Sequence, residues 1–465
     1  MERKYLSNLI NWLNNPLRKP LLIYGARQVG KTTLIKDLFA KKYFEKYIYI
    51  DFKIDVAERI YIKNHIKAKD IITYLEMKNN ITIDKDTLII FDEVQECIPC
   101  LTALKYFSQD YPDIPVIATG SMIRIRLKQL EYEGVNIKLD PEITKENQDG
   151  HNNYMFPTGK INTLDMYPMT FNEFLKARNS KLYDFIKESY KEKKVLEDEY
   201  HKIALEYIYD YIVIGGMPEA VDVFIKTSSY VEAKNTLKTL YNDYLNDFTL
   251  FQISQETIMR TKKVFDNIYL ELNKENKNFK ISLIEEGKRY RDYMYPFDWL
   301  ESGRIIYKSH LLKENITLPL RESSDSLFRV YLADPGLLAL QTGISTEKIK
   351  ESISKNDYRG LLFENFVAGT LRSHQVPLFY WMGKTSSELE FFIVLRDEII
   401  PIDVKKTKGK LSSLENYRTH NKNKYAIKIS SNKYGYSEEN SILTLPFYYL
   451  EFFIEENENL IFKKD

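Results

Sequence analysis

The stretch Gly25-Ala26-Arg27-Gln28-Val29-Gly30-Lys31-Thr32 decides the fold of the N-terminal part of this chain. It has the spacing G-x-x-x-x-G-K-[ST], and it lies between an apolar segment, residues 21–24, and a helical pattern that begins at Thr33. A strand that leads through such a loop into a helix directs successive backbone N–H groups at one point, where anions bind. The sequence therefore predicts a phosphate-binding loop.

The loop also predicts the ligands. We expect Lys31 to reach the β- and γ-phosphate oxygens of ATP and the Thr32 hydroxyl to ligate Mg²⁺, so that the predicted cofactors are ATP and Mg²⁺. The predicted nucleotide-binding residues are Gly25, Ala26, Arg27, Gln28, Val29, Gly30, Lys31, Thr32 and Thr33.

Two further strand ends complete the predicted catalytic site. The apolar run 88–91 is followed by Asp92 and Glu93, and we expect Asp92 to hold the Mg²⁺ water shell and Glu93 to polarise the attacking water. Thr119-Gly120-Ser121 ends the next strand, where Ser121 is predicted to sense the γ-phosphate; a plain structural turn is the alternative. The predicted catalytic residues are thus Glu93, Lys31 and Ser121, with Thr32 and Asp92 at the metal.

Length and composition exclude several classes of protein. The chain has 465 residues and is 44% apolar and 29% charged, which predicts a globular protein of several domains. Its net charge of +1 provides no global attraction to nucleic acid or anionic lipid. No uncharged apolar run approaches the roughly 20 residues that span a bilayer, so we expect a soluble, cytoplasmic protein with no membrane partner. Cys97 and Cys100 form a C-x-x-C without a second ligand pair, which argues against a zinc or redox site.

The first 125 residues alternate strand and helix patterns, which predicts an α/β fold with a parallel sheet. The predicted strands are residues 20–24, 47–51, 87–92 and 114–119, and the predicted helices are 31–40, 56–77 and 101–108. Residues 131–159 are polar and predict an insertion. Beyond them the sequence predicts tyrosine-rich helices over residues 171–251, a small helical domain over 255–340 with two short strands, and a last unit from residue 358.

The C-terminal unit contains a predicted carboxylate hairpin. Residues 388–395 and 398–405 flank Arg396-Asp397, a two-residue turn, so that residues whose numbers sum to 793 lie opposite each other. Glu390 then faces Asp403, and Glu388 faces Lys405, on the side opposite an apolar face. A Mg²⁺ site built from Glu364, Glu390, Asp403 and Lys405 is one interpretation. An edge hairpin with a solvated charged face is the other.

These motifs together resemble one family over nearly the whole chain. The chain is similar to prokaryotic AAA-type ATPases whose C-terminal region is a domain of unknown function with a restriction-endonuclease-like fold of the PD-(D/E)xK type. The motifs that carry the resemblance are Gly25–Thr32, Phe91-Asp92-Glu93-Val94-Gln95, Thr119-Gly120-Ser121, Tyr167-Pro168-Met169-Thr170-Phe171-Asn172-Glu173-Phe174, Gly215-Gly216-Met217-Pro218-Glu219-Ala220, Leu332-Ala333-Asp334-Pro335-Gly336-Leu337-Leu338, Phe363-Glu364-Asn365 and the hairpin 388–405.

The resemblance implies four parts. These are an AAA-type P-loop ATPase domain over residues 1–165, a helical lid or linker over 166–254, a winged-helix-like domain over 255–345 and a nuclease-like domain over 346–465. The chain departs from the family pattern at Glu390 and Asp403, where the family shows Asp and Glu respectively. Opposing changes of side-chain length either preserve the metal position or mark a site that is not used for cleavage. Gly159-Lys160 stands where the family has Gly-Arg, so no arginine finger is assigned.

Two functions follow from the sequence. The first is an ATPase that couples its nucleotide state to a C-terminal nuclease-like module that binds or acts on DNA. The second is a nucleotide-controlled interaction protein whose nuclease-like fold is inactive, with a protein partner or self-association in place of cleavage. Retention of Lys31, Thr32, Asp92 and Glu93 favours hydrolysis in both cases.

Overall fold

A computed structural model describes residues 1–132, 137–138, 154–250, 254–314, 316–354, 360–383, 387–405, 412–421, 423 and 425–461. Internal contacts divide the chain into two compact units. The N-terminal unit comprises Glu2–Tyr167 with Thr249–Gln255, and the C-terminal unit comprises Pro168–Phe248 with Glu256–Asp465. The finer, four-part division remains a prediction. Most of the predicted insertion at residues 131–159 lies outside the described residues.

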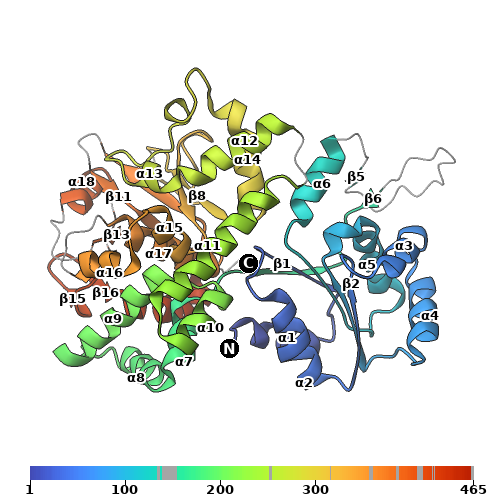
Figure 1. The fold of residues 1–465 in the computed structure, drawn as a ribbon. Helices are drawn as coiled ribbons and strands as arrows, with labels where there is room; N and C mark the ends of the chain where they lie inside the picture. The colour runs from blue at the N-terminus through green and yellow to red at the C-terminus, as the bar shows by residue number, and fades with distance from the viewer. Residues whose placement is uncertain are drawn as a thin grey trace. The chain divides into compact units, whose positions relative to one another are not determined.

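The N-terminal unit is an α/β fold around a five-stranded parallel sheet (Figure 1). The strand order is β2-β3-β4-β1-β7. The strands are β1 (Leu21–Gly25), β2 (Lys46–Asp51), β3 (Thr87–Asp92), β4 (Val116–Gly120) and β7 (Asn162–Met166). The first four confirm the predicted strands, with ends displaced by at most two residues. Sequence reasoning missed β7, which is only partly buried.

Helices of this unit follow the strands as alternation predicts. They are α1 (Tyr5–Asn14), the π-helix η1 (Thr33–Ala40), α2 (Lys41–Tyr43), α3 (Val56–Asn64), α4 (Ala68–Asn79), the short 3₁₀ turn η2 (Val94–Glu96), α5 (Ile98–Asp110) and α6 (Ile123–Tyr132). The single helix predicted over residues 56–77 is wrong in one respect, because the chain leaves the helical conformation at His65 and Lys67 and forms two helices. Apolar side chains of α3, α4 and α5 pack with those of the sheet in one core.

The C-terminal unit begins with helices, as the sequence predicts. These are α7 (Phe171–Arg178), α8 (Ser180–Lys191), α9 (Asp198–Ile214), α10 (Pro218–Thr227), α11 (Tyr230–Asp247), α12 (Gln255–Asp266), α13 (Ile268–Leu272), α14 (Tyr290–Ser302), α15 (Pro335–Gln341) and α16 (Thr346–Ser354). A capping box between Thr170 and Glu173 starts α7. The predicted interruption at Gly215 and Gly216 separates α9 from α10.

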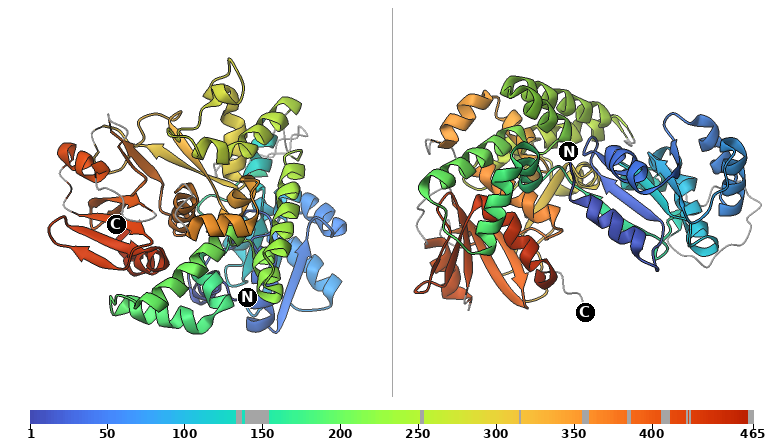
Figure 2. Two further views of the ribbon diagram at one scale, coloured as in Figure 1. Left: turned by 60° about the vertical axis from the view of Figure 1, so that its left-hand side comes forward. Right: turned by 90° about the horizontal axis from the view of Figure 1, so that it is seen from below.

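Two sheets complete this unit, and Figure 2 shows their strands from yellow to red. One has the order β11-β10-β8-β9, and the other has the order β12-β13-β14-β16-β15. The strands are β8 (Ile306–Leu311), β9 (Phe328–Leu332), β10 (Phe379–Met382), β11 (Glu388–Leu389), β12 (Phe391–Leu395), β13 (Glu398–Val404), β14 (Ala426–Ser430), β15 (Gly435–Ser437) and β16 (Ile442–Pro446). Helices α17 (Leu361–Ser373), α18 (Ser412–His420) and α19 (Leu450–Ile461) accompany them. Because β8 pairs with β10, one sheet joins segments on both sides of the boundary predicted at residue 345.

Three of the quoted motifs meet in a buried junction of the C-terminal unit. The Asp334 carboxylate accepts hydrogen bonds from the backbone N–H groups of Gly216 at 2.6 Å and of Leu337 at 3.0 Å. The Met169 N–H donates to the Gly216 carbonyl at 2.7 Å. A Cβ atom on Gly216 would lie 1.9 Å from the Met169 carbonyl oxygen, so only glycine fits. These motifs therefore have a packing role, which joins α9, α10 and the start of α15.

Candidate functional site

The loop between β1 and η1 has the conformation that its glycines predict. Gln28 and Gly30 adopt positive φ angles of 61° and 89°, and the chain then enters η1. Lys31 is buried, and its ammonium group donates to the carbonyls of Gly25 at 3.0 Å and Ala26 at 2.8 Å. The lysine is therefore held at the loop by the backbone of the loop itself.

Asp92 is the centre of a hydrogen-bond cluster at the carboxyl ends of the strands. Its Oδ2 atom accepts from the Thr32 hydroxyl at 2.7 Å and from the Tyr49 hydroxyl at 2.8 Å, and its Oδ1 atom accepts from the Thr119 hydroxyl. Because β4 lies between β1 and β3, it brings Thr119 to the same carboxylate as Thr32. The ammonium of Lys36 lies 4.2 Å from the centre of the Tyr49 ring, a cation–π contact. Sequence reasoning identified Thr32 and Asp92 but missed Tyr49.

Glu93 follows Asp92 in a left-handed backbone conformation, with φ 55° and ψ 46°. Its carboxylate accepts a hydrogen bond from the side-chain amide of Gln95. Gln95 in turn lies against the end of β4, where a Cβ atom on Gly120 would be 2.5 Å from the Gln95 amide oxygen. The glycine of the Thr119-Gly120-Ser121 motif therefore makes room for the residue that orients Glu93.

Burial shifts the pKa values of the two charged groups of the site, Lys31 and Glu93. It lowers the pKa of the Lys31 ammonium to about 8, although Glu93 and Asp92 act in the opposite direction. It raises the pKa of the Glu93 carboxyl, although Lys31 and the Gln95 amide oppose the change. A partly buried carboxylate whose pKa lies above its usual value has the protonation chemistry of a general base.

The N-terminal segment clamps the loop, which no sequence motif indicated. The buried guanidinium of Arg3 donates to the carbonyls of Val29 at 2.6 Å and of Tyr167 at 2.7 Å. The Tyr5 hydroxyl accepts from the Tyr167 N–H at 3.0 Å. The segment before α1 thus ties the loop to the residue that follows β7.

The remaining predicted residues of this unit lie nearby. Thr33 is the first residue of η1 and is exposed, and Ser121 is buried directly after β4. Their roles remain predictions. Cys97 and Cys100 are free thiols in the core of the sheet and helices, and burial raises the pKa of both.

The predicted hairpin is confirmed between β12 and β13. Phe391 pairs with Ile402 and Leu395 with Glu398, which is the predicted register. Arg396 and Asp397 both have positive φ angles, 49° and 64°, as a two-residue turn of this kind requires.

The pairing predicted between Glu388 and Lys405 is wrong. Glu388 belongs to β11, which pairs with β10 and not with β13, because the chain leaves the ladder at Glu390. The Glu388 carboxylate instead accepts from Arg329 at 2.5 Å and from Lys277 at 2.8 Å.

The other predicted residues of this unit do come together, and we call Glu364, Glu390, Asp403 and Lys405 the acidic cluster. The three acids are buried. The Lys405 ammonium lies 2.8 Å from Asp403 Oδ1 and 3.5 Å from Glu390 Oε1. The second oxygen of Glu390 accepts from the Val404 N–H at 2.9 Å. The hairpin therefore brings the carboxylates together around an ammonium group.

Two basic side chains that the sequence did not indicate border the acidic cluster. Lys277 lies between Glu364 Oε1, at 2.6 Å, and Glu388, and Arg329 is fully buried beside Glu388. Both come from segments far from the hairpin in sequence. Lys277, Arg329 and Lys405 thus offset most of the negative charge of the neighbouring acids.

Protonation of Glu390 bears on whether a cation fits the acidic cluster. Burial raises the pKa of Glu390 to about 8, with Lys405 acting in the opposite direction. Glu364 Oε2 has no hydrogen-bond partner among the described residues, which leaves one buried oxygen for a cation. The donor set is that of a Mg²⁺ site, but the ammonium groups of Lys277 and Lys405 lie against its oxygens.

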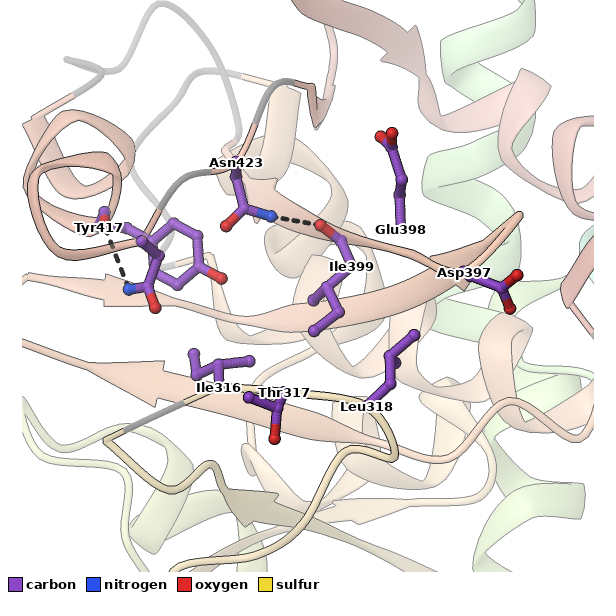
Figure 3. Close-up of a pocket in the computed structure, with 9 residues that line it drawn as sticks. Ile316, Thr317, Leu318, Asp397, Glu398, Ile399, Tyr417 and Asn423 are labelled. Atoms are coloured by element: carbon purple, nitrogen blue, oxygen red, sulfur yellow. Dashed lines mark hydrogen bonds between the residues drawn. The ribbon is translucent and has the colours of Figure 1, made fainter.

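A pocket of about 780 Å³ lies beside the hairpin turn in the same unit (Figure 3). Ile316, Leu318, Glu398 and Tyr417 are among its lining residues, and the Asn423 amide donates to the Ile399 carbonyl at its wall. None of the predicted site residues lines it. The pocket is therefore separate from the acidic cluster.

The parallel sheet, the phosphate loop and the Asp92 cluster define the N-terminal unit as a P-loop nucleotide-binding fold. Residues 17–140 match the family described as an AAA domain, which supports an AAA-type ATPase. Residues 205–348 and 359–448 match two families described as domains of unknown function, DUF8612 and DUF4143.

An uncharacterized protein of Methanocaldococcus jannaschii is 23% identical over 336 residues, which are 69% of this chain and 58% of that protein. The chain thus matches little more than half the length of this relative. Among solved structures, AMPPCP-bound DnaA from Aquifex aeolicus is 13% identical and covers 63% of this chain and 86% of its own, with a TM-score of 0.24.

A signal transduction ATPase with numerous domains and a tetratricopeptide repeat sensor, from Pyrococcus horikoshii, is 10% identical. The match covers 80% of this chain and 48% of the Pyrococcus horikoshii chain, with a TM-score of 0.24. With TM-scores this low, neither solved structure supports a conclusion about the fold of this chain. Among the described residues, none of the helices combines the length and apolar character that crossing a membrane requires.

Proposed function

We propose that the N-terminal unit binds Mg·ATP and hydrolyses it. The observation that carries the proposal is the hydrogen bond of 2.7 Å between Thr32 and Asp92, which unites the two predicted metal ligands beside Lys31. A hydroxyl and a carboxylate are hard oxygen donors that suit Mg²⁺, so the residues fit the ion. The ion, when bound, would neutralise charge on the β- and γ-phosphates.

Each residue of the site has a distinct proposed task. Lys31 presents positive charge to the phosphates from a buried position, where that charge is poorly solvated and gains most from an anion. Thr32 and Asp92 would hold Mg²⁺, and Tyr49 and Thr119 orient the Asp92 carboxylate. Glu93 accepts a proton from the attacking water, and its raised pKa supports that task.

Hydrolysis is tested by replacing Glu93 with glutamine, which cannot accept that proton. We expect Glu93→Gln to bind ATP with unchanged affinity and to hydrolyse it at least about 100-fold more slowly, as the loss of a general base predicts. Glu96→Gln, at an exposed site three residues further on, is the matched control. A Glu93→Gln variant that hydrolyses ATP at the wild-type rate would exclude Glu93 as the base.

For the C-terminal unit we propose a nucleic-acid- or protein-binding role that is controlled by the nucleotide, without cleavage. Glu364, Glu390, Asp403 and Lys405 have the composition of a nuclease-like metal site, but the ammonium groups of Lys277 and Lys405 already pair with these acids. The pKa of Glu390, which burial raises to about 8, also favours the inactive alternative, because a protonated carboxyl is a poor metal ligand. Helices α12, α13 and α14 and the antiparallel β8–β9 pair fall in the segment that we propose to be winged-helix-like, a domain type that would contact DNA, a protein partner or a second copy of this chain.

One experiment separates binding from cleavage. Duplex and single-stranded DNA are incubated with the protein and Mg²⁺ or Mn²⁺, and both retention and cutting are measured with and without ATP. The proposal predicts no cutting above the level of an Asp403→Ala variant. Cutting that Asp403→Ala abolishes, and that the exposed-site control Glu398→Ala retains, would establish a nuclease instead.

A further inference from the structure

A second group of potential metal ligands lies away from both sites described above. His374 directly follows α17, and α19 carries Glu451, Glu455 and Glu458 at spacings of four and three residues, which place them on one face of the helix. One ring nitrogen of His374 and one carboxylate oxygen each of Glu451 and Glu455 all lie within 4.8 Å of one another. His374 and Glu451 are only 5% and 3% exposed, whereas Glu455 is exposed. The group therefore extends from the protein interior to solvent.

We propose that His374, Glu451 and Glu455 form a binding site for a divalent transition metal, with Zn²⁺ as the preferred ion. An imidazole nitrogen with two carboxylates is a donor set that zinc uses, and imidazole favours zinc over Mg²⁺ or Ca²⁺. Two ligands at about 2.1 Å from a tetrahedral ion are about 3.4 Å apart. The distance from His374 Nε2 to Glu451 Oε1 is 3.5 Å, which matches that separation.

The surroundings of the two ligands also match those of a metal site. His374 Nδ1 lies 3.4 Å from Glu458 Oε1, so a carboxylate faces the second ring nitrogen, as it does around histidines that bind zinc. The other oxygen of Glu451 accepts from the Asn172 N–H at 3.0 Å, which fixes the orientation of this carboxylate. Three elements, α17, α19 and the first turn of α7, thus converge on the site.

An imidazolium–carboxylate ion pair is the simpler explanation for these contacts. Such a pair closes to a hydrogen bond of about 2.7–2.9 Å. The Glu451 carboxylate stands farther from the ring than that, at 3.5 Å, which is the separation expected of two ligands of one ion. The spacing therefore favours an ion between ligands over direct contact of the charges.

The consequence of metal binding is a link between helices that are far apart in sequence. The ion would tie the end of α17 to α19, and through Glu451 to the start of α7. Binding to the folded state alone raises thermal stability by an amount that grows with the logarithm of the free ion concentration once it exceeds the Kd. The proposed role is structural and is independent of ATP.

The test uses the full-length, metal-free protein without nucleotide, titrated with Zn²⁺ and, as a spectroscopic probe, with Co²⁺. We expect one ion per chain, a rise in melting temperature, and visible Co²⁺ absorption bands without thiolate charge transfer, which excludes Cys97 and Cys100 as ligands. His374→Asn should abolish binding. Glu458→Gln should weaken it about tenfold or more, because it orients the ring and is not itself a ligand.

Two controls keep the result decisive. Glu456→Gln changes a neighbouring acid on α19 whose carboxylate contacts Lys193 at 2.6 Å, and it should bind Zn²⁺ as the wild type does. If His374→Asn fails to fold, Glu455→Gln replaces it, because Glu455 is exposed and its loss should still weaken binding. Absence of binding to the wild type at 100-fold molar excess of Zn²⁺, or unchanged affinity in the His374 and Glu455 variants, would overturn the proposal.

Discussion

The hydroxyl of Thr32 donates a hydrogen bond of 2.7 Å to Asp92 Oδ2, although 60 residues separate the two in sequence. The contact joins the last residue of the phosphate loop to the end of β3 across an intervening strand. Around it lie a buried lysine, a glutamate with a raised pKa and a glutamine that donates to that glutamate.

Gln95 is a positioning residue for Glu93, and its loss should slow hydrolysis. We expect Gln95→Ala to lower kcat about tenfold and leave ATP affinity unchanged, because the carboxylate loses its amide donor. The same donor lowers the pKa of Glu93, so the acidic limb of the kcat–pH profile should move to higher pH. Glu96→Ala is the control at an exposed neighbour. An unchanged pH profile in Gln95→Ala would show that the amide does not act on Glu93.

Arg3 should contribute to nucleotide affinity from outside the loop. Arg3→Ala removes charged donors from the buried carbonyls of Val29 and Tyr167, which costs about 1–3 kcal/mol in the free energy of unfolding. Because the loop then loses a restraint, we expect ATP to bind several-fold more weakly. Thermal unfolding and calorimetric titration measure the two effects, with the neighbouring Lys4→Ala as control. Wild-type affinity in Arg3→Ala would contradict a role for the clamp.

Glu390 should make the C-terminal unit less stable as the pH rises. Its pKa is raised to about 8 in the folded state, so the proton is bound more tightly there than in the unfolded chain. This contribution is fully present below the unfolded pKa near 4.5 and is lost as the pH rises through about 8. Glu390→Gln carries no such proton and should be more stable than the wild type at pH 9, with the difference shrinking toward pH 6.

The proton on Glu390 should also weaken the binding of cations at the acidic cluster. Any binding of Mn²⁺ at the acidic cluster must displace the proton from Glu390, so its affinity should rise between pH 6 and pH 9 in the wild type. Asp403→Ala should remove the Mn²⁺-dependent increase in melting temperature. Binding that is independent of pH and survives Asp403→Ala would locate the ion elsewhere.

The parts of the fold that the sequence predicts are those encoded locally. The loop over residues 25–32 and the strand that ends at Asp92 are contiguous motifs, and the two-residue turn at Arg396 and Asp397 determines the hairpin register. The break between α3 and α4 escaped prediction because no proline or glycine marks it. Strand β7 escaped because an edge strand need not be apolar on both faces.

Sequence patterns did not indicate most of the residues that contact the predicted site residues. Tyr49 contacts Asp92, and Arg3 contacts the phosphate loop, only because the tertiary fold brings them together. Neither residue belongs to a recognisable motif. Lys277 lies 87 residues from Glu364 and 111 from Glu388, so its neutralising role depends entirely on chain packing. A register counted along one hairpin also fails where the chain leaves the ladder, as it does at Glu390.

The most direct test of the proposed function is calorimetric titration of ATP, with Mg²⁺ present, into the wild type and Lys31→Ala between pH 7 and pH 10. We expect binding to the wild type whose affinity is constant below about pH 8 and then falls by up to about tenfold per pH unit, because burial lowers the pKa of Lys31 to about 8 and only the ammonium form attracts phosphate. Lys31→Ala, with its fold intact by circular dichroism, should show no measurable binding at any pH. Wild-type affinity in that variant would contradict the assignment of residues 25–33 as the ATP site.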